Sequence, residues 1–188
     1  MRVAGLVLAA GEGRRLGTPK ALVETGGLRL VDRAVDALRL GGCDPVVVVL
    51  GAARVDVPDA HVVTNDDWPS GMGSSLRLGL ATLDEVAATA AVLTLVDTPG
   101  VTAAVVDRLV AACAVGADVV VATYDGQPRT PVLLTRAHWP EVAEMAVGDV
   151  GARAFLRAHP HLVRHVECGD VGTSDDLDTP EDLARFSR

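Results

Sequence analysis

The sequence predicts a three-layer α/β/α fold built on a predominantly parallel, mixed central sheet. Short β-branched runs alternate along the chain with stretches whose apolar residues recur at helical spacing, as in βαβ units. The strand candidates are continuous apolar runs, which is typical of strands that helices cover on both faces. The 188 residues show no internal repeat, low-complexity tract or long linker, so we expect one domain spanning residues 1–188.

The expected elements alternate in order along the chain. Strands are predicted at residues 3–8, 46–50, 61–64, 91–96, 118–124, 132–134 and 162–166. Helices are predicted at residues 30–40, 74 to about 86, 102–114, 139–145, 150–159 and 180–185. Gly41 and Gly42 end the first helix, Thr102 caps the third, and Pro180 lies in the first turn of the last.

The composition excludes several classes of protein. Apolar residues make up 49% and charged residues 22%, which argues against disorder. The net charge of −8 argues against a general binder of nucleic acid or of membrane surfaces. The three cysteines are far apart and odd in number, which fits a reduced, cytoplasmic protein better than a zinc site or a disulfide framework.

The apolar residues 3–10 after Arg2 resemble the core of a secretory signal. No Ala-x-Ala site follows them, and the next five residues are rich in glycine and charge, so we interpret the run as a buried strand. No apolar run approaches the roughly 20 residues that a membrane-spanning helix needs. We therefore expect no membrane insertion.

Residues 9–20 have the composition of a phosphate-binding loop. Gly11, Gly13 and Gly17 allow backbone N–H groups to point at one anion, and Arg15 and Lys20 add positive charge. The loop lacks the Gly-Lys-Ser/Thr of a Walker A motif, and its glycine spacing is one residue too long for a dinucleotide fingerprint. An ordinary surface turn is the alternative interpretation.

Lys20 is the single lysine beside sixteen arginines. Arginine thus serves wherever a surface charge is sufficient, and a compact ammonium suits a phosphate oxygen in a tight loop. Compositional drift would also leave one lysine behind. Combined with the glycines and Arg15, the observation favours a polyphosphate ligand.

Three polar or glycine-rich segments follow strand ends, at residues 9–20, 65–75 and 97–100. Ligands of open α/β sheets bind beyond the carboxyl ends of the strands, so these segments predict one composite site. Asp97 is either a Mg²⁺ ligand or a turn residue. Asp178, in an acidic segment near residue 180, is either a second metal ligand or the cap of the last helix. The five histidines are scattered and are interpreted as structural.

Residues 8–20 read L-A-A-G-x-G-x-R-L-G-x-P-K, which resembles the opening motif of the nucleotidyltransferases that act on molybdenum cofactor. Their cytidylyltransferase branch is the most similar, and the cytidylyltransferase of isoprenoid synthesis is a more distant relative. The resemblance runs from Leu8 to Leu183 and implies a Rossmann-like nucleotidyltransferase fold. In that family the loop wraps a nucleoside triphosphate, which implies that Arg15 and Lys20 are catalytic at the α-phosphate.

The resemblance also assigns a metal site and a nucleotide. The family has a D-x-D-T-P-E-D-L segment whose second aspartate helps to hold the metal, which corresponds to Asp178, with Asp176 as the second choice. Mg²⁺ on Asp97 and Asp178 is therefore the expected cofactor. The Ala-Ala-Gly form of the loop is similar to that of members that use CTP, whereas GTP-using members more often show Ala-Gly-Gly.

Further segments resemble family motifs on the nucleotide and acceptor sides, N-x-x-W-x-x-G-x-x-x-S-L at residues 65–76 and G-D-x-G-A-R at residues 148–153. The nucleotide contacts that we expect are Leu8, Ala9, Ala10, Gly11, Gly13, Lys20, Asn65, Gly71, Ser74, Ser75 and Asp97. The acceptor contacts that we expect are Thr98, Pro99, Thr130, Asp149 and Arg153. Residues 65–76 also fit a capped helix with Trp68 packed on the core, and Arg153 also fits an exposed helical position.

Two positions depart from the family pattern. Thr98 stands where Gln or Met is usual, and Arg129-Thr130-Pro131 stands where Gly-His-Pro is common. Both border the expected acceptor side, so the nucleotide half of the site is predicted more firmly than the acceptor.

The leading hypothesis is an enzyme that transfers CMP from CTP to a phosphorylated acceptor, most of all a molybdopterin-type cofactor, and releases pyrophosphate. Another acceptor, such as a sugar or alcohol phosphate, or another nucleoside triphosphate is the alternative within the class. A molybdoenzyme or its chaperone would be a fitting protein partner. Two hypotheses lie outside the class: a nicotinamide-dependent oxidoreductase of a pigment-like heterocycle, and a nucleotide-binding regulator without turnover.

Overall fold

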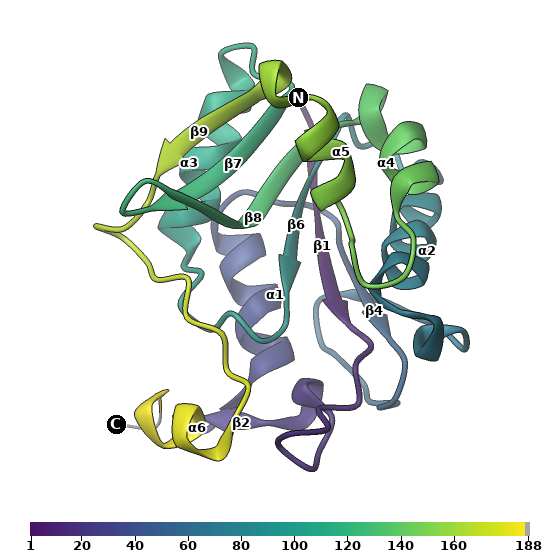
Figure 1. The fold of residues 1–188 in the computed structure, drawn as a ribbon, viewed down its shortest axis with the longest axis vertical. Coiled ribbons are helices and arrows are strands. Elements are labelled where there is room, and N and C mark those ends of the chain that lie inside the picture. Colours follow the sequence, from purple (N-terminus) through teal and green to yellow (C-terminus); the bar gives the residue numbers. More distant parts are fainter. Residues whose placement is uncertain (187–188) are drawn as a thin grey trace.

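A computed structural model describes residues 1–186 of the chain and shows a seven-stranded sheet between two layers of helices (Figure 1). The strands are β1 (Val3–Ala9), β4 (Val46–Leu50), β5 (His61–Thr64), β6 (Ala90–Leu95), β7 (Val119–Tyr124), β8 (Gln127–Thr135) and β9 (Val163–Glu167). The helices are α1 (Leu30–Leu40), α2 (Met72–Asp84), α3 (Ala103–Ala114), α4 (Trp139–Met145), α5 (Arg153–Ala158) and α6 (Pro180–Phe186). A short hairpin of β2 (Glu24–Thr25) and β3 (Leu28–Arg29) stands apart from the sheet.

The sheet has the order β5-β4-β1-β6-β8-β7-β9. β5, β4, β1 and β6 pair in parallel, while β8 runs antiparallel to both of its neighbours, and β9 is parallel to β7. The predicted predominantly parallel, mixed sheet with helices on both faces is therefore confirmed. β1 lies at the centre of the parallel half, so the loop that follows it emerges in the middle of the sheet's carboxyl edge.

Two apolar layers hold the helices on the sheet. Val7 on β1 belongs to the layer that packs against α1 and α3, and the neighbouring Leu6 and Leu8 belong to the layer that packs against α2, α4 and α5. This alternation follows from the period of two in a strand. Most buried residues of both layers are apolar, with exceptions such as Thr94 and Thr123, which explains why the inner strands read as nearly continuous apolar runs.

Three predicted elements differ from the structure by two or more residues at a boundary, and several others differ by one. The helix expected from residue 74 begins at Met72 and ends at Asp84, and the helix expected over 150–159 begins only at Arg153, because Gly148 and Gly151 adopt positive φ in the turns before it. The strand expected over 132–134 extends over Gln127–Thr135, because it forms a hairpin with β7. Thr102 caps α3 as predicted, since its hydroxyl oxygen accepts the Val105 N–H at 3.3 Å.

Over the described part of the chain, no helix combines the length and the apolar character needed to cross a membrane.

Candidate functional site

A cleft of about 410 Å³ opens where β1 and β6 end. It is lined by the glycine-rich loop after β1, the end of β6, the start of α2 and two aspartates from further along the chain. The lining residues are Leu8, Ala10, Gly11, Glu12, Gly13, Arg14, Arg15, Lys20, Trp68, Pro69, Gly71, Met72, Ser75, Leu95, Val96, Asp97, Asp149 and Asp178.

The loop after β1 is folded back on itself around Gly13. The carbonyl oxygen of Gly13 accepts the N–H groups of Leu16 and Gly17, both at 2.9 Å. Gly13 has a φ of +66°, and a Cβ there would lie 2.0 Å from the carbonyl oxygen of Thr18. Only glycine fits this turn, which places Lys20 at the start of the 3₁₀ turn Lys20–Leu22 and at the floor of the cleft.

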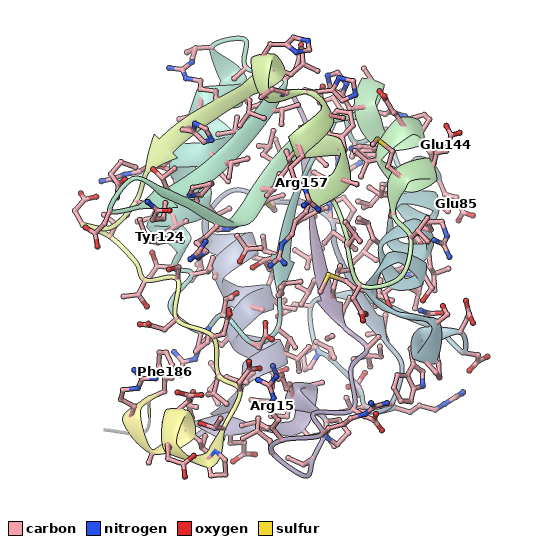
Figure 2. All side chains as sticks on the ribbon, viewed as in Figure 1. Arg15, Glu85, Tyr124, Glu144, Arg157 and Phe186 are labelled. Carbon is pink, nitrogen blue, oxygen red and sulfur yellow. The ribbon has the colours of Figure 1, made fainter. Side chains whose placement is uncertain are left out.

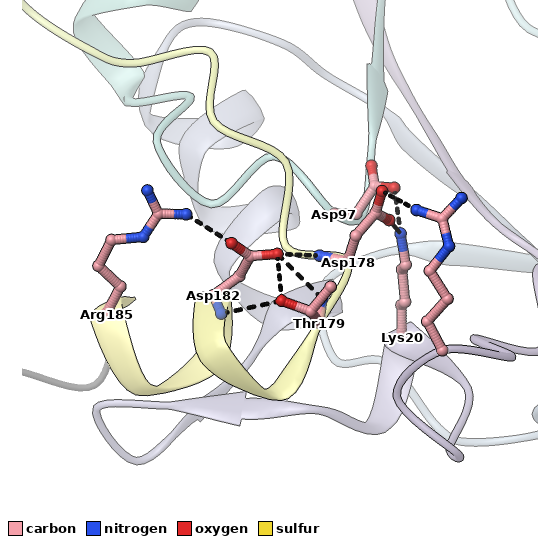
Figure 3. Close-up of polar contacts among 7 residues, drawn as sticks. Lys20, Asp97, Asp178, Thr179, Asp182 and Arg185 are labelled. Atoms are coloured by element: carbon pink, nitrogen blue, oxygen red, sulfur yellow. Dashed lines mark hydrogen bonds and ion pairs between the residues drawn. The ribbon is translucent and has the colours of Figure 1, made fainter.

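Lys20 bridges two carboxylates at the centre of the site (Figure 3). Its Nζ lies 2.6 Å from Oδ2 of Asp97 and also donates to Oδ1 of Asp178. Only 17% of the Lys20 side chain and 20% of the Asp97 side chain are exposed. Burial by itself would lower the pKa of Lys20, but the charges and hydrogen bonds of Asp97 and Asp178 outweigh it and raise that pKa above its usual value of 10.5. The amine is therefore a permanent cation at neutral pH.

Asp97 keeps one oxygen free for a further partner. Its Oδ1 is buried and has no hydrogen-bond partner in the described chain, although a buried carboxylate oxygen ordinarily accepts at least one bond. A hard cation would satisfy it. Burial, with the charges of Asp97 and Asp178, raises the pKa of the nearby Asp176 above its usual value.

Within residues 1–186, no three Asp, Glu, His or Cys side chains are already gathered around a common metal position. Lys20 instead lies between the two aspartates that the sequence predicts as metal ligands. The residues fit Mg²⁺ in donor type and in the free oxygen of Asp97, provided that the ammonium and the ion share the carboxylates.

Asp178 reaches the cleft on the segment between β9 and α6, which runs back to the N-terminal loop (Figure 1). The backbone N–H of Leu177, a fully buried residue, donates to the backbone oxygen of Asp97 at 2.8 Å. Arg15, at the same end of the molecule as α6, donates to Asp178 Oδ2 at 3.1 Å (Figure 2). Asp178 therefore points into the cleft, and Thr179 takes the capping position of α6 that was the alternative for Asp178.

The start of α2 forms the opposite wall. The amide of the buried Asn65 donates to the hydroxyl oxygens of Ser74 and Ser75, at 2.8 and 2.9 Å. Asp149 accepts the N–H of Met72 at 3.2 Å and so caps α2. Its negative charge is stabilised there by the positive N-terminal end of the helix dipole. Gly71 allows this contact, because a Cβ there would lie 2.6 Å from the backbone of Gly148.

The structure does not bring all the predicted contacts to the cleft wall. Ala9, Asn65 and Ser74 are buried behind it, and Thr130 and Arg153 are not among its lining residues. Thr98 and Pro99 line a separate small hollow against α1, and the Thr98 hydroxyl donates to the backbone oxygen of Leu95 at 2.8 Å. Arg153 is exposed at the start of α5, as its alternative interpretation expected, and the predicted contacts of all these residues with ligands remain predictions.

Sequence reasoning missed several residues that the structure places at the site. Glu12, Arg14 and Met72 line the cleft, and Asp182 fixes the backbone beside Asp178. The Thr-x-x-Asp spacing of Thr179 and Asp182 is a capping pattern that could have identified the last of these.

The sequence and the fold are similar to those of several known proteins. The MobA-like NTP transferase domain matches residues 5–163. A nicotine blue oxidoreductase from Paenarthrobacter nicotinovorans is 40% identical, covering 98% of this chain and 96% of that protein. A molybdenum cofactor guanylyltransferase from Rhodobacter capsulatus is 31% identical, covering 98% of this chain and 95% of that protein. Among solved structures, a Mycobacterium tuberculosis H37Rv protein in complex with manganese superimposes with a TM-score of 0.80 and 27% identity, covering 99% of this chain and 98% of the other.

Proposed function

We propose that this chain, which belongs to the MobA-like NTP transferase family, transfers a nucleotide from a nucleoside triphosphate to a phosphorylated, molybdopterin-type acceptor. In this reaction an oxygen of the acceptor phosphate attacks the α-phosphorus and forms a new P–O bond. The bond from the α-phosphorus to the bridging oxygen breaks, and pyrophosphate leaves with that electron pair. The acceptor oxygen is already an anion, so the reaction needs no dedicated base.

The single observation that carries the proposal is the bridge from Lys20 to Asp97 and Asp178 at the floor of the cleft. Positioning and charge neutralisation account for most of the catalysis of such transfers. Lys20 and Arg15 would hold the phosphate oxygens and stabilise the negative charge of the leaving pyrophosphate. The loop around Gly13 would hold the triphosphate with its backbone.

Mg²⁺ is the proposed cofactor, held by Asp97 and Asp178, and it would neutralise negative charge on the phosphate oxygens. The free oxygen of Asp97 supports this assignment. The manganese complex of the Mycobacterium tuberculosis protein supports a divalent ion in this fold.

The nucleotide is the finer point. The Ala9-Ala10-Gly11 form of the loop favours CTP by its resemblance to CTP-using members, and CTP is our proposal from the sequence. The name of the Rhodobacter capsulatus relative favours GTP instead. An assay of pyrophosphate release with each of the four ribonucleoside triphosphates, with and without a molybdopterin-type acceptor, decides between them. The expected result is acceptor-dependent release with CTP or GTP and loss of release in Lys20→Ala. No release with any pair would reject the transferase proposal.

The 40% identity to the nicotine blue oxidoreductase favours a second candidate, the transfer of a hydride from a nicotinamide cofactor to a pigment-like heterocycle. This function predicts oxidation of NADH or NADPH that depends on nicotine blue. Pyrophosphate release without such oxidation would exclude it, and the reverse result would replace the first proposal. A regulator without turnover would bind the nucleotide, show neither reaction, and tolerate Asp97→Asn.

A further inference from the structure

Asp182 makes a reciprocal set of hydrogen bonds at the start of α6 (Figure 3). Its Oδ2 accepts the backbone N–H of Asp178 at 3.2 Å, the N–H of Thr179 at 3.0 Å and the Thr179 hydroxyl at 2.8 Å. In return, the Asp182 N–H donates to the Thr179 hydroxyl oxygen at 3.2 Å. This is a capping box with two additional bonds to Oδ2, one from the Thr179 hydroxyl and one from the N–H of Asp178, the residue that precedes the cap.

The bond from the Asp178 N–H links the cap to the cleft. The backbone beside Asp178 is held on one side by the Leu177–Asp97 hydrogen bond and on the other by Asp182. Between these two anchors the Asp178 carboxylate has its oxygens on Lys20 and Arg15. The carboxylate itself is partly exposed, so burial does not hold it in place.

We propose that Asp182 is a positioning residue that holds Asp178 against Lys20 and so completes the carboxylate pair of the cleft. Its third partner, Arg185, pairs with the other oxygen, Oδ1, and contacts neither Asp178 nor Thr179 in the described hydrogen bonds and ion pairs. One oxygen of the Asp182 carboxylate, Oδ2, therefore binds Asp178 and Thr179, and the other, Oδ1, binds Arg185 on α6. The relevance of this to catalysis rests on the proposed function, but the positioning itself does not.

The single lysine gives a direct readout that needs no substrate. In the wild type, two carboxylates contact the Lys20 amine, so we expect it to react slowly with an acetylating reagent, and peptide mass spectrometry reports on one lysine site only. In Asp182→Ala the Asp178 segment is released, and we expect Lys20 to react about 3- to 30-fold faster, the range implied by the loss of a helix cap. Thr179→Val should show the same direction, and Thr179→Ser should stay near the wild type.

Arg185→Ala is the matched control, because it removes the ion pair with Asp182 and leaves the bonds to Asp178 and Thr179 in place. It should leave the Lys20 reaction rate within about twofold of the wild type. Asp182→Asn keeps one acceptor oxygen and should fall between the wild type and Asp182→Ala.

A double-mutant cycle tests whether Asp182 acts through Asp178. In the Asp178→Asn background, Asp182→Ala should produce no further change in Lys20 reactivity or in Mn²⁺ affinity. Equal effects in both backgrounds, or an unchanged rate in a folded Asp182→Ala protein, would overturn the proposal. If Asp182→Ala does not fold, the Lys20 reaction rates of Thr179→Val and Asp182→Asn decide the question in its place. Failure of nucleotide transfer in the wild type would leave these results standing, so the two proposals fail separately.

Discussion

The backbone N–H of Leu177 donates to the backbone oxygen of Asp97 at 2.8 Å. This bond joins the segment that carries Asp178 to the end of the central strand β6, which Asp97 follows closely. The segments that carry the two carboxylates are thus joined by a backbone hydrogen bond, and Lys20 contacts both carboxylates. A site held in this way responds to substitutions in three separate parts of the chain.

Replacing Lys20 by methionine should affect metal affinity and activity in opposite directions. The substitution removes the cation that lies between Asp97 and Asp178, so Mn²⁺ should bind the nucleotide-free protein at least about threefold more tightly. Nucleotide transfer should fall about 100-fold or more, because charge stabilisation at the phosphates is lost. Calorimetric titration with Mn²⁺ and the pyrophosphate assay measure the two effects.

Arg54→Met is the control for net charge. Arg54 pairs with Asp66 on the surface and does not line the cleft, so both quantities should stay at their wild-type values. Weaker Mn²⁺ binding in Lys20→Met would show that the metal and the ammonium do not share the carboxylates.

Gly13→Ala should destabilise the loop and weaken nucleotide binding. The new Cβ would lie 2.0 Å from the Thr18 carbonyl oxygen, and alanine is strained at a φ of +66°. We expect the free energy of unfolding to fall by about 1–3 kcal/mol, measured by urea denaturation, with a parallel loss of nucleotide affinity. Gly17→Ala has a similar φ, +72°, and no atom within 4 Å of the new Cβ, so it isolates the conformational cost and should lose less. Equal losses would mean that the close contact with Thr18 is relieved by movement of the loop.

Asn65→Ala should destabilise the protein by about 1–3 kcal/mol, because it breaks a buried hydrogen-bond network. Ser74 and Ser75 would lose a donor, and the N–H of Asp67 would lose its acceptor. Thermal and urea unfolding measure the change. Ser70→Ala removes only exposed bonds to Asp67 and should cost less than about 0.5 kcal/mol. An unchanged free energy of unfolding in Asn65→Ala would show that this hydrogen-bond network does not stabilise the protein.

Stability should depend on pH through Asp182. The Thr179 hydroxyl and the Asp178 N–H, with help from the Thr179 N–H and Arg185, lower the pKa of Asp182 from 3.8 to about 2. A lowered pKa in the folded state stabilises the protein above pH 3.8, and that contribution is lost as the pH falls from 3.8 towards 2. The difference in unfolding free energy between the wild type and Asp182→Asn should be constant above about pH 5 and shrink below about pH 4. A difference that does not change with pH would contradict the assigned hydrogen bonds.

The sequence predicted the fold well, because the inner strands β1, β4, β6 and β7 are covered on both faces and read as nearly continuous apolar runs. Residues 46–50 and 61–64 have the predicted bounds. The pairing of β8 could not be read from its own residues, since its polar first half, Gln127–Thr130, is held by the hairpin with β7 rather than by burial. The start of α5 was misjudged because Gly148 and Gly151 are used in a turn that docks on α2.

The residues at the floor of the cleft were predictable from their place after strands and from the family resemblance. Lys20, Asp97 and Asp178 were selected in this way, and the structure brings them together. Their mutual arrangement was not predictable, because it depends on pairing between segments distant in sequence. The same reason explains Asp149, which the resemblance placed on the acceptor side and which caps α2 in the structure. It also explains why Thr98, expected to contact the acceptor, instead donates its hydroxyl to the backbone oxygen of Leu95.

The late position of Asp178 in the chain has a consequence for truncated forms of the protein. Every strand of the sheet, through Glu167 at the end of β9, precedes Asp178 in the sequence. Without Asp178, Lys20 has a single acidic partner from this pair. A product cut anywhere between Glu167 and Asp178 would keep all seven strands while its cleft remained half assembled.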